Sequence, residues 1–395
     1  MAHISHLIED RDITISTIAN IAMVAATGQL NGATEKMDGA NITFSCTSKY
    51  EARFSRSEGD IKKGGMPHAV LEAKFSGRGL VQDTFSGGAK AIRASIRALA
   101  PQELIKTFEG LQCWYSAEVI YTKNPNIVSY DHDAIVLHER PVLRHFGDDV
   151  FPVIDGHLGD KNFAVLRSRL IDMDANVREL GWRVLGPQIV KLNRVKSASS
   201  WNALNAVLVG MGGCSTTIQD FLVARAKDDL KRFGMSEDLF EASARRLSEM
   251  QGCPSLTILR ARVPSSVAVM LRASDVWITK QLRPLELAIS DFAIDLLADA
   301  KPSLVCDPDA ETECMRSKLK EALVKIEKSR NQHSIDYAKY QMEKLKDVDR
   351  VTTPLEGIVF PWGGKLYKLT GAFAPLNAIV GLCRYGRGKL MPAIV

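Results

Sequence analysis

The sequence predicts an α+β fold in which strands from both ends of the chain build one β-rich body and a large all-helical segment interrupts it. Runs rich in Thr, Ile, Val and Phe at residues 41–54 and 113–121 are typical of strands. Apolar residues recur at helical spacing through most of residues 160–347. Two short β-like runs around a Pro-Trp-Gly-Gly turn at residues 356–370 indicate a hairpin. We therefore divide the chain into residues 1–159, a helical insertion at 160–347, and residues 348–395, which complete the first part.

The composition is that of an average soluble globular protein. The 395 residues suffice for two or three domains, or for one domain with a large insertion, and 46% are hydrophobic and 25% charged. A net charge of +5 permits a polyanionic partner without requiring one. The seven cysteines are scattered and show neither a CxxC pair nor zinc spacing, which fits reduced thiols in a cytoplasm. No signal-peptide order is present, and the apolar run at 15–28 is too short for a bilayer, so we expect a buried helix and no membrane partner.

The first part of the chain should contain four strands. Residues 41–54 read as two antiparallel strands around a turn-like Ser-Lys-Tyr-Glu. Helical patterns follow, notably at 88–111, and strand character returns at 113–121 and 134–139, with a polar loop between. In the insertion, the helical patterns lie at residues 176–192, 217–233, 236–250, 284–300 and 311–346.

The stretch "ATEKMDGANITFS", residues 33–45, places a lysine before Met-Asp-Gly inside a strand-like run. Gly39 would weaken a strand, and Asp38 prefers turns to ladders. One interpretation is an ordinary hairpin turn with an exposed lysine. The other is that Lys36 is held at a sharp bend so that its amine can attack a substrate.

Lys36 is also the first of five short motifs. "KMDG" is followed about twenty residues later by "RFSRSEG", in which Arg56 fits the spacing better than Arg53. The later motifs are "WYSAEVIY" with Glu118, "EGIVF" with Glu356, and "GKLYKLT" with Lys365 and Lys368.

In this order the motifs resemble those of the covalent nucleotidyltransferase superfamily, which comprises ATP-dependent DNA ligases, RNA ligases and mRNA capping enzymes. The resemblance is strongest to the nick-sealing RNA ligases, whose E-K-x-x-G-[TA]-N pattern is met by Glu35, Lys36, Gly39, Ala40 and Asn41. It covers residues 35–150 and 350–375, under half of the chain. It implies an antiparallel-sheet nucleotidyltransferase (adenylation) domain of the ATP-grasp-like ligase type, with the helical insertion between the third and fourth motifs.

The resemblance also implies the chemistry. The amine of Lys36 attacks the α-phosphate of ATP and forms lysyl-AMP, with release of pyrophosphate. A free lysine is almost fully protonated at neutral pH, so the resemblance implies that burial and nearby positive charge, from metal ions and the lysines of the last motif, tune this amine. Roles implied for the other residues are ATP binding by Glu35, Gly39, Asn41, Arg56, Glu118 and Glu356, binding of Mg²⁺ by Glu118 and Glu356, and contact with the α-phosphate by Lys365 and Lys368. Gly39 would let the backbone turn tightly beside the nucleotide.

Several features depart from the superfamily pattern. The last motif usually reads K-x-K, but here the lysines are spaced K-x-x-K, so Lys365 and Lys368 remain alternatives for the phosphate contact. Tyr130 and His138 lie where the family places an aromatic residue that stacks on the base, and ordinary packing is the alternative for both. Only 25 residues follow Thr370, too few for the OB-fold that DNA ligases and capping enzymes append.

The resulting expectation is an ATP-dependent polynucleotide ligase of RNA-ligase type, cytoplasmic and bacteriophage-like, that joins 5′-phosphate to 3′-hydroxyl ends. A DNA ligase is the alternative within the superfamily, and a nucleic-acid-binding or structural protein that retains the fold without the activity is the alternative outside it. The insertion carries the chain's small positive excess and should bind nucleic acid, RNA before DNA, unless it serves oligomerisation or a protein partner. Its last helical pattern carries Arg316, Lys318, Lys320, Lys325, Lys328 and Arg330.

Overall fold

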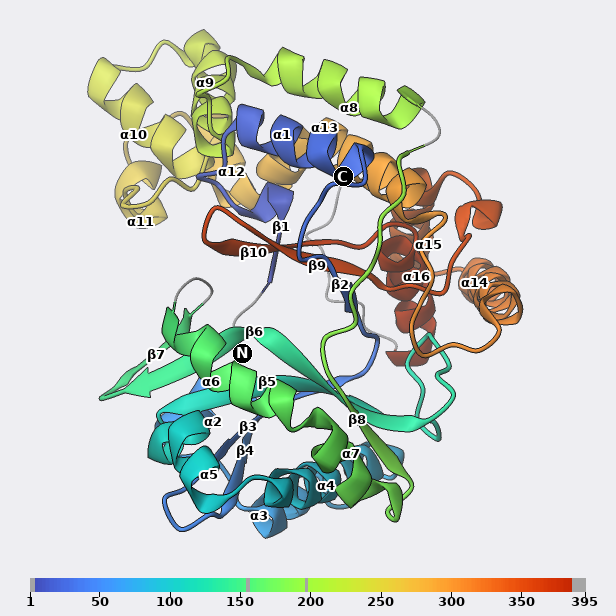
Figure 1. The fold of residues 1–395 in the computed structure, drawn as a ribbon. Helices are drawn as coiled ribbons and strands as arrows, with labels where there is room; N and C mark the ends of the chain where they lie inside the picture. Colours follow the sequence, from blue (N-terminus) through green and yellow to red (C-terminus); the bar gives the residue numbers. More distant parts are fainter. Residues whose placement is uncertain (1–3, 154–156, 196–197, 386–395) are drawn as a thin grey trace.

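Two β-sheets face each other in the computed structural model, which describes residues 4–153, 157–195 and 198–385 (Figure 1). The small sheet has the strand order β1 (Ser5–His6), β10 (Lys365–Leu369), β9 (Gly357–Trp362) and β2 (Thr34–Lys36). Strands β9 and β10 form an antiparallel hairpin, β2 pairs with β9 in antiparallel register, and β1 runs parallel to β10. The expected hairpin at 356–370 is therefore confirmed, and both ends of the chain contribute to this sheet.

The large sheet is built from the first half of the chain. Its order is β4 (Ala52–Ser55), β3 (Ala40–Cys46), β5 (Cys113–Ile120), β6 (Asp133–Phe146) and β7 (Asp149–Val153), all antiparallel. β8 (Trp182–Leu185) adds a parallel partner to β6. The four strands expected in this region are confirmed, and the mixed helix-and-strand class with mainly antiparallel sheets is observed.

Helices cover the outer face of the large sheet. They are α3 (His68–Lys74), α4 (Leu80–Ser95), α5 (Pro101–Phe108), α6 (His157–Ser168) and α7 (Leu170–Arg178). The short α2 (Glu58–Lys62) instead packs Ile61 on Trp114 and Leu143, on the other face of the sheet. Because side chains alternate along a strand, β3 and β5 send apolar residues such as Phe44 and Tyr115 to the outer face, where both pack on Phe108 with ring centroids 5.9 and 5.5 Å away. Polar residues of the same strands are left for the other face, which looks toward the small sheet.

The remaining helices surround the small sheet in two groups. The first, which includes the expected buried helix α1, comprises α1 (Ile15–Ala26), α8 (Ala198–Met211), α9 (Ile218–Leu230), α10 (Glu237–Leu247), α11 (Leu256–Arg260), α12 (Ser265–Arg272) and α13 (Ser274–Leu297). Ile18, Phe292 and Phe360 share one core, so α1 and α13 cover the side of β9 that faces away from the large sheet. The second group comprises α14 (Pro308–Ser329), α15 (Gln332–Leu345) and α16 (Phe373–Tyr385).

The prediction that residues 160–347 are all-helical was wrong at 176–192. There α7 ends, Gly181 adopts a positive φ of 77°, and β8 follows. Trp182 and Val184, which are alternate residues of β8, point into the core of the large sheet, and the ring of Trp182 stacks on that of Tyr121 with centroids 6.0 Å apart. Pairing with β6 therefore overrides a pattern that also fits a helix, and α6, α7 and β8 belong to the large sheet's layer.

The pattern at 311–346 also forms two helices instead of one, because the chain turns at Arg330 with a φ of 54°. Within the described ranges, no helix has both the length and the apolar character that crossing a membrane would require.

Candidate active site

Lys36 lies where the chain passes from one sheet to the other. It is the last residue of β2 in the small sheet, and β3 of the large sheet begins at Ala40. Met37, Asp38 and Gly39 are therefore a crossover between sheets. The interpretation as an ordinary hairpin turn was wrong, because the strands on either side of this segment do not pair with each other.

Asp38 fixes this crossover to the loop before β6. Its carboxylate accepts hydrogen bonds from the Asn126 side chain at 2.8 Å and from the backbone amides of Ile127 and Val128 at 2.7 and 2.9 Å. The backbone amide of Asp38 donates to the Tyr130 hydroxyl at 2.8 Å. Burial raises the pKa of Asp38, and the three hydrogen bonds to its carboxylate act against that rise. The crossover is therefore rigid on the side opposite the lysine.

Gly39 is required by a close approach of two backbones. A Cβ atom at this position would lie 2.8 Å from the carbonyl oxygen of Val119 and 2.7 Å from Cγ of Glu118. The chain bends at Gly39, but its φ does not lie in the left-handed region, so it is the close approach to β5 that requires a glycine here. Its function is to let the crossover touch β5.

Lys36 forms an ion pair with Glu356. Glu356 immediately precedes β9, and the next residue, Gly357, pairs with Lys36 in the ladder. Burial raises the pKa of Glu356 to about 8, although the positive charge of Lys36 acts in the opposite direction. Two residues separated by 320 positions thus form one partly buried pair whose charged state is disfavoured by burial.

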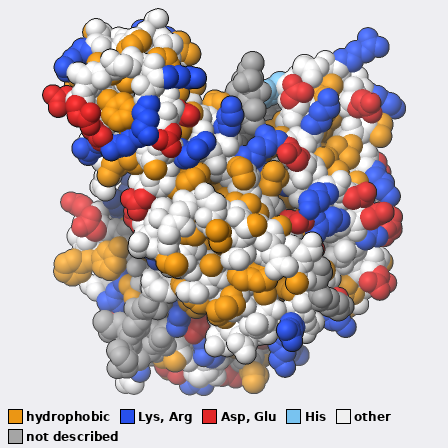
Figure 2. Space-filling model, turned by 90° about the horizontal axis from the view of Figure 1, so that it is seen from above, with side chains coloured by type: hydrophobic (Ala, Val, Ile, Leu, Met, Phe, Trp, Pro, Cys, Tyr) orange, Lys and Arg blue, Asp and Glu red, His pale blue; other side chains and the backbone are white. Residues whose placement is uncertain are grey.

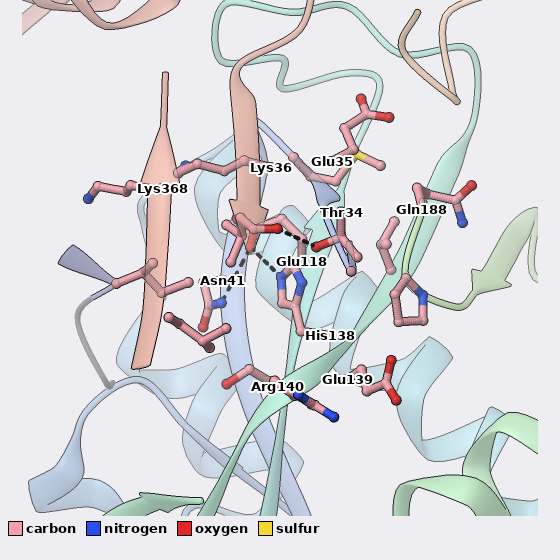
Figure 3. A pocket seen from close by; sticks show the side chains of 18 of the residues that line it. Thr34, Glu35, Lys36, Asn41, Glu118, His138, Glu139, Arg140, Gln188 and Lys368 are labelled. Atoms are coloured by element: carbon pink, nitrogen blue, oxygen red, sulfur yellow. Dashed lines mark hydrogen bonds and ion pairs between the residues drawn. The ribbon is translucent and has the colours of Figure 1, made fainter. Parts of the chain in front are cut away.

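A cavity of about 360 Å³ separates the two sheets at this point (Figure 3). Lys36 and Lys368 line the cavity from the small sheet, and Asn41, Glu118 and His138 line it from the large sheet. The volume lies within the range usual for small-ligand sites. Apolar lining comes from Val136, Pro187, Val359, Pro361 and Leu366. The cavity therefore combines charged groups from both sheets with an apolar lining.

Glu118 is held by two neighbours on the large sheet. Its Oε2 accepts from the Asn41 amide at 3.3 Å and lies 3.2 Å from Nε2 of His138 (Figure 3). Asn41 and Glu118 are opposite each other in the β3–β5 ladder, which explains their contact. His138 therefore contacts a carboxylate at the cavity wall, and Tyr130 is instead packed under the crossover.

The alternation of strand β10 separates the two lysines of the last motif. Residues three positions apart point to opposite faces of a strand. Lys368 lines the cavity, whereas Lys365 pairs with Asp10 at 2.8 Å on the other side. Burial lowers the pKa of Lys368, and the charge of Lys36 lowers it further. Of the two alternatives, the structure brings only Lys368 to Lys36.

The two candidate arginines also have different surroundings. Arg56 reaches the backbone carbonyl of Asn41, and its guanidinium lies 4.4 Å from the centre of the Phe85 ring. Arg53 instead pairs with Glu51 at 3.0 Å near the surface. Arg56 lines a second cavity, of about 390 Å³, on the other side of Asn41 and Glu118.

Glu35 does not point where its expected role requires. Glu35 is among the residues that line the cavity, but its side chain points away from that of Lys36 (Figure 3). Its carboxylate accepts hydrogen bonds from the backbone amide and hydroxyl of Ser303 at 2.8 and 2.6 Å. Burial raises its pKa. This side chain therefore attaches the chain after α13 to β2.

Two basic residues of α14 are bound to the protein itself. Lys318 donates to the carbonyl oxygen of Ile127 at 2.7 Å, and Arg316 donates to those of Val351 and Asp349 at 2.9 and 3.0 Å. The expectation that all six basic residues of this region are available for phosphates is therefore corrected for these two. Lys320, Lys325 and Lys328 are exposed.

Glu118 and Glu356 are the carboxylates that would bind a divalent cation. Among the described residues, no cluster of three or more His, Cys, Asp or Glu side chains has the geometry of a metal site. Mg²⁺ commonly takes only one or two carboxylates and completes its shell with water and substrate phosphates, so the donor set fits a cation that arrives with a nucleotide.

Sequence reasoning missed the attachment of Asp38 to residues 126–128, the second cavity, and the contribution of Pro187 and Gln188 to the first cavity. Asp38 could have been found as part of "KMDG", but its partners lie in a loop without a recognisable pattern.

Comparisons with protein-family models, curated proteins and solved structures gave no significant match to this chain.

Proposed function

We propose that the protein is an ATP-dependent polynucleotide ligase, with RNA preferred over DNA, that acts through a lysyl-AMP intermediate on Lys36. The observation that carries the proposal is the meeting of motif residues from distant parts of the chain. Lys36, Glu118 and Lys368 line one cavity, and Glu356 is paired with Lys36. Their order along the chain was the basis of the resemblance, and their proximity is independent support for it.

The first step needs a neutral amine on Lys36. Glu356, whose pKa burial raises toward neutrality, is in contact with that amine and is suited to accept its proton. The nitrogen then attacks the α-phosphorus of ATP, a nitrogen–phosphorus bond forms, and the bond to pyrophosphate breaks. Lys368 would stabilise the negative charge that develops on the α-phosphate oxygens. Glu118, and Glu356 while it is ionised, would hold Mg²⁺ together with the phosphates, and the cation would neutralise further phosphate charge.

The later steps transfer AMP and join the strands. A 5′-phosphate oxygen attacks the phosphorus of lysyl-AMP, and the nitrogen–phosphorus bond breaks and frees Lys36. A 3′-hydroxyl then attacks the 5′-phosphate, loses its proton, and displaces AMP. The mixed apolar and polar lining is suited to hold the nucleoside of ATP, with His138 and Val136 on the wall of the large sheet and Val359 beside the lysines on the wall of the small sheet.

Cytoplasmic location is part of the proposal. None of the seven cysteines, all of which lie in the described part of the chain, forms a disulfide, as expected for thiols in a reducing compartment.

The test is incubation with α-labelled ATP and, separately, α-labelled GTP, followed by a denaturing gel. We expect a protein adduct with AMP that is labile to acid and stable to base. Lys36→Ala should abolish it, and Lys36→Arg should fail as well, since a guanidinium stays protonated and is no nucleophile. Labelling only by GTP would indicate a capping enzyme. Absence of any adduct would favour a nucleic-acid-binding or structural protein, and normal labelling of Lys36→Ala would refute the assignment.

A further inference from the structure

Residues 250–274 form α11, α12 and the turns beside them, and they contain no acidic residue. Their charged residues are Arg260, Arg262 and Arg272, and all three are exposed. Within the described part of the chain, no ion pair joins these arginines to a carboxylate, whereas Arg283 of α13 is paired with a glutamate. We call their exposed side the arginine surface. Helices α11 and α12 lie on the opposite side of the molecule from α14 (Figure 1).

The acidic residues closest in sequence to the arginine surface have other partners. Glu249 accepts a hydrogen bond from the hydroxyl of Ser274 at 2.7 Å, and Asp275 accepts one from the backbone amide of Val276 at 2.9 Å. On α10, which packs against both helices, Glu241 is paired with a lysine of α9 at 2.6 Å. None of these three carboxylates forms an ion pair with the arginines, so the surface keeps its positive charge.

The opposite sides of α11 and α12 are fixed in the protein core. Leu259 of α11 and Leu271 of α12 are buried in the hydrophobic cluster that also contains residues of α1, α13 and β10. Positions i, i+4 and i+7 of a helix share a face, so Ser265, Val269 and Arg272 lie together on the exposed side of α12. One core therefore holds the arginine surface at a fixed position relative to β10, a strand of the candidate active site.

The side chains around the arginines suit a phosphate backbone. The exposed neighbours are small or carry a hydroxyl: Thr257, Ala261, Ser265 and Ser266. A guanidinium can bind a phosphate through two parallel hydrogen bonds, and Ser and Thr hydroxyls also donate to phosphate oxygens. The eight residues of α12 span roughly 12 Å, so arginines beside its two ends can contact phosphates about three nucleotides apart.

The same stretch lacks the features of two other kinds of partner. Residues 250–274 contain no Phe, Tyr or Trp. Proteins that bind single strands stack the bases on aromatic side chains, and helices that lie on a membrane need a broad apolar face turned outward. Here the apolar faces of both helices are in the core, and the exposed Ile258 and Val269 are single aliphatic side chains of a kind usual on protein surfaces. The partner favoured by the chemistry is a duplex, whose bases are already stacked.

We propose that the arginine surface binds the phosphate backbone of the duplex that flanks the ends to be joined. The surface lies in the helical segment, outside the residues covered by the resemblance to nucleotidyltransferases. Its role in positioning a substrate rests on the proposed ligase function, whereas the duplex contact itself does not require lysyl-AMP. The contact is electrostatic and independent of base sequence, so it weakens as salt rises.

Three triple variants test this surface. The first replaces its three arginines by glutamine: Arg260→Gln, Arg262→Gln and Arg272→Gln. The second replaces the same arginines by lysine and keeps the charge. The matched control removes three positive charges from exposed residues of the helical layer on the large sheet: Arg93→Gln, Arg97→Gln and Lys106→Gln.

Binding of a nicked RNA duplex and of a single-stranded RNA of equal length is measured over a range of salt concentrations, together with self-adenylylation. For the glutamine variant we expect about tenfold weaker duplex binding, with a salt slope shallower by about 0.9 for each lost contact. The loss for single-stranded RNA should be smaller, and self-adenylylation should stay within about twofold. The lysine variant should retain most of the duplex affinity, because an ammonium still binds phosphate as a point charge. The matched control should bind the duplex as the wild type does.

Several outcomes would overturn the proposal. An unchanged duplex affinity and salt slope in the glutamine variant would refute it, as would an equal loss in the matched control or an equal loss for single-stranded RNA. Binding of the wild type to phosphatidylserine vesicles that the glutamine variant loses, with duplex binding unchanged, would assign the surface to a membrane instead. If the wild type forms no adduct with AMP, the ligase proposal fails, while a loss of duplex binding confined to the glutamine variant would still support the arginine surface.

Discussion

At the residue scale, the proposed attack by the amine of Lys36 depends on its pair with Glu356. Neither side chain is fully exposed, with 28% and 12% of their side-chain surfaces accessible. Removing charged groups from water favours their neutral forms, and the contact lets a proton pass between them.

Replacement of Glu356 should change how stability depends on pH. The folded-state pKa of about 8 lies above the ordinary value of 4.5, so protonation favours the folded state. This contribution is fully present below about pH 4.5 and is lost as pH rises through about 8. Glu356→Gln, which stays neutral, should therefore gain stability relative to the wild type across that window.

The measurement is chemical denaturation of both proteins at pH 5 and pH 8.5. The exposed Glu321→Gln on α14 serves as a control and should show no such trend. A difference between Glu356→Gln and the wild type that is constant with pH, or that shrinks as pH rises, would contradict the raised pKa.

Gly39 provides a steric prediction. Gly39→Ala would press a methyl group against the Val119 carbonyl and Glu118, and should destabilise the protein by about 1–3 kcal/mol. Gly59→Ala, in α2, is the control, because its Cβ would find its nearest neighbour, Ser57 Oγ, 3.8 Å away. Thermal unfolding should show a lower midpoint only for Gly39→Ala. Equal midpoints for both variants would mean that the crossover is less tightly packed than described.

At the scale of elements, strand β10 decides between the two lysines of its motif. Its alternation places Leu366 and Lys368 at the cavity and Lys365 and Tyr367 on the opposite face, where both contact Asp10. Two lysines spaced K-x-K would lie on the same face of a strand. With the K-x-x-K spacing found here, only one of the two lysines can face the cavity.

Because Lys368 and Lys365 lie on opposite faces of β10, we expect different outcomes for the two lysine variants. Lys368→Ala should slow self-adenylylation by about a hundredfold, since it removes a charge directed at the developing phosphate charge. Lys365→Ala should leave that rate within about twofold and cost at most about 1 kcal/mol of stability from the exposed pair with Asp10. Rates are measured from adduct formation in single-turnover labelling. A larger effect of Lys365→Ala would contradict the assignment of faces.

The return of the chain to Glu356 is fixed by several elements together. Arg350 pairs with Asp291 and Asp295 of α13, and Thr353 donates to the carbonyl of Ala300 at 2.8 Å. Arg316 of α14 donates a hydrogen bond to the carbonyl oxygen of Val351. The helical segment therefore positions the fourth motif, whatever else it binds.

At the scale of the whole molecule, charge is spread thinly. Figure 2 shows hydrophobic and uncharged side chains in the middle of the face seen from above, with basic and acidic side chains mixed toward its edges. The segments at 13–34 and 198–219, which contain α1 and α8, hold no charged residue, and Met23 and Val209 are exposed. A protein partner or oligomer through the helical segment remains a proposal.

Nucleic acid binding should depend on the exposed lysines of α14. Reversal of Lys320, Lys325 and Lys328 to Glu should weaken binding of RNA and flatten its salt dependence by about 0.7 in slope for each lost contact with a single strand. Lys318 is left intact, because it supports the loop at Ile127. Affinity is measured over a range of salt concentrations, with self-adenylylation as the control that should not change. An unchanged affinity and slope would direct attention to a protein partner.

The sequence by itself determined most of the local elements and singled out the residues of the candidate site. Runs rich in β-branched and aromatic residues located the strands around Phe44 and Tyr115, turn residues located the hairpin that carries Lys368, and apolar residues at helical spacing located most helices, because a helix buries one face. It also singled out Lys36, Glu118 and Glu356, since short motifs preserve residue types and spacing.

Only the tertiary structure decided which of these residues meet. The pairing of β8 with β6, the choice of Lys368 over Lys365, the turn of Glu35 toward Ser303 and the attachment of Asp38 to residues 126–128 all depend on contacts between distant segments. Local patterns carry no information about such partners, because burial and hydrogen bonding at these positions arise only when the two sheets pack together.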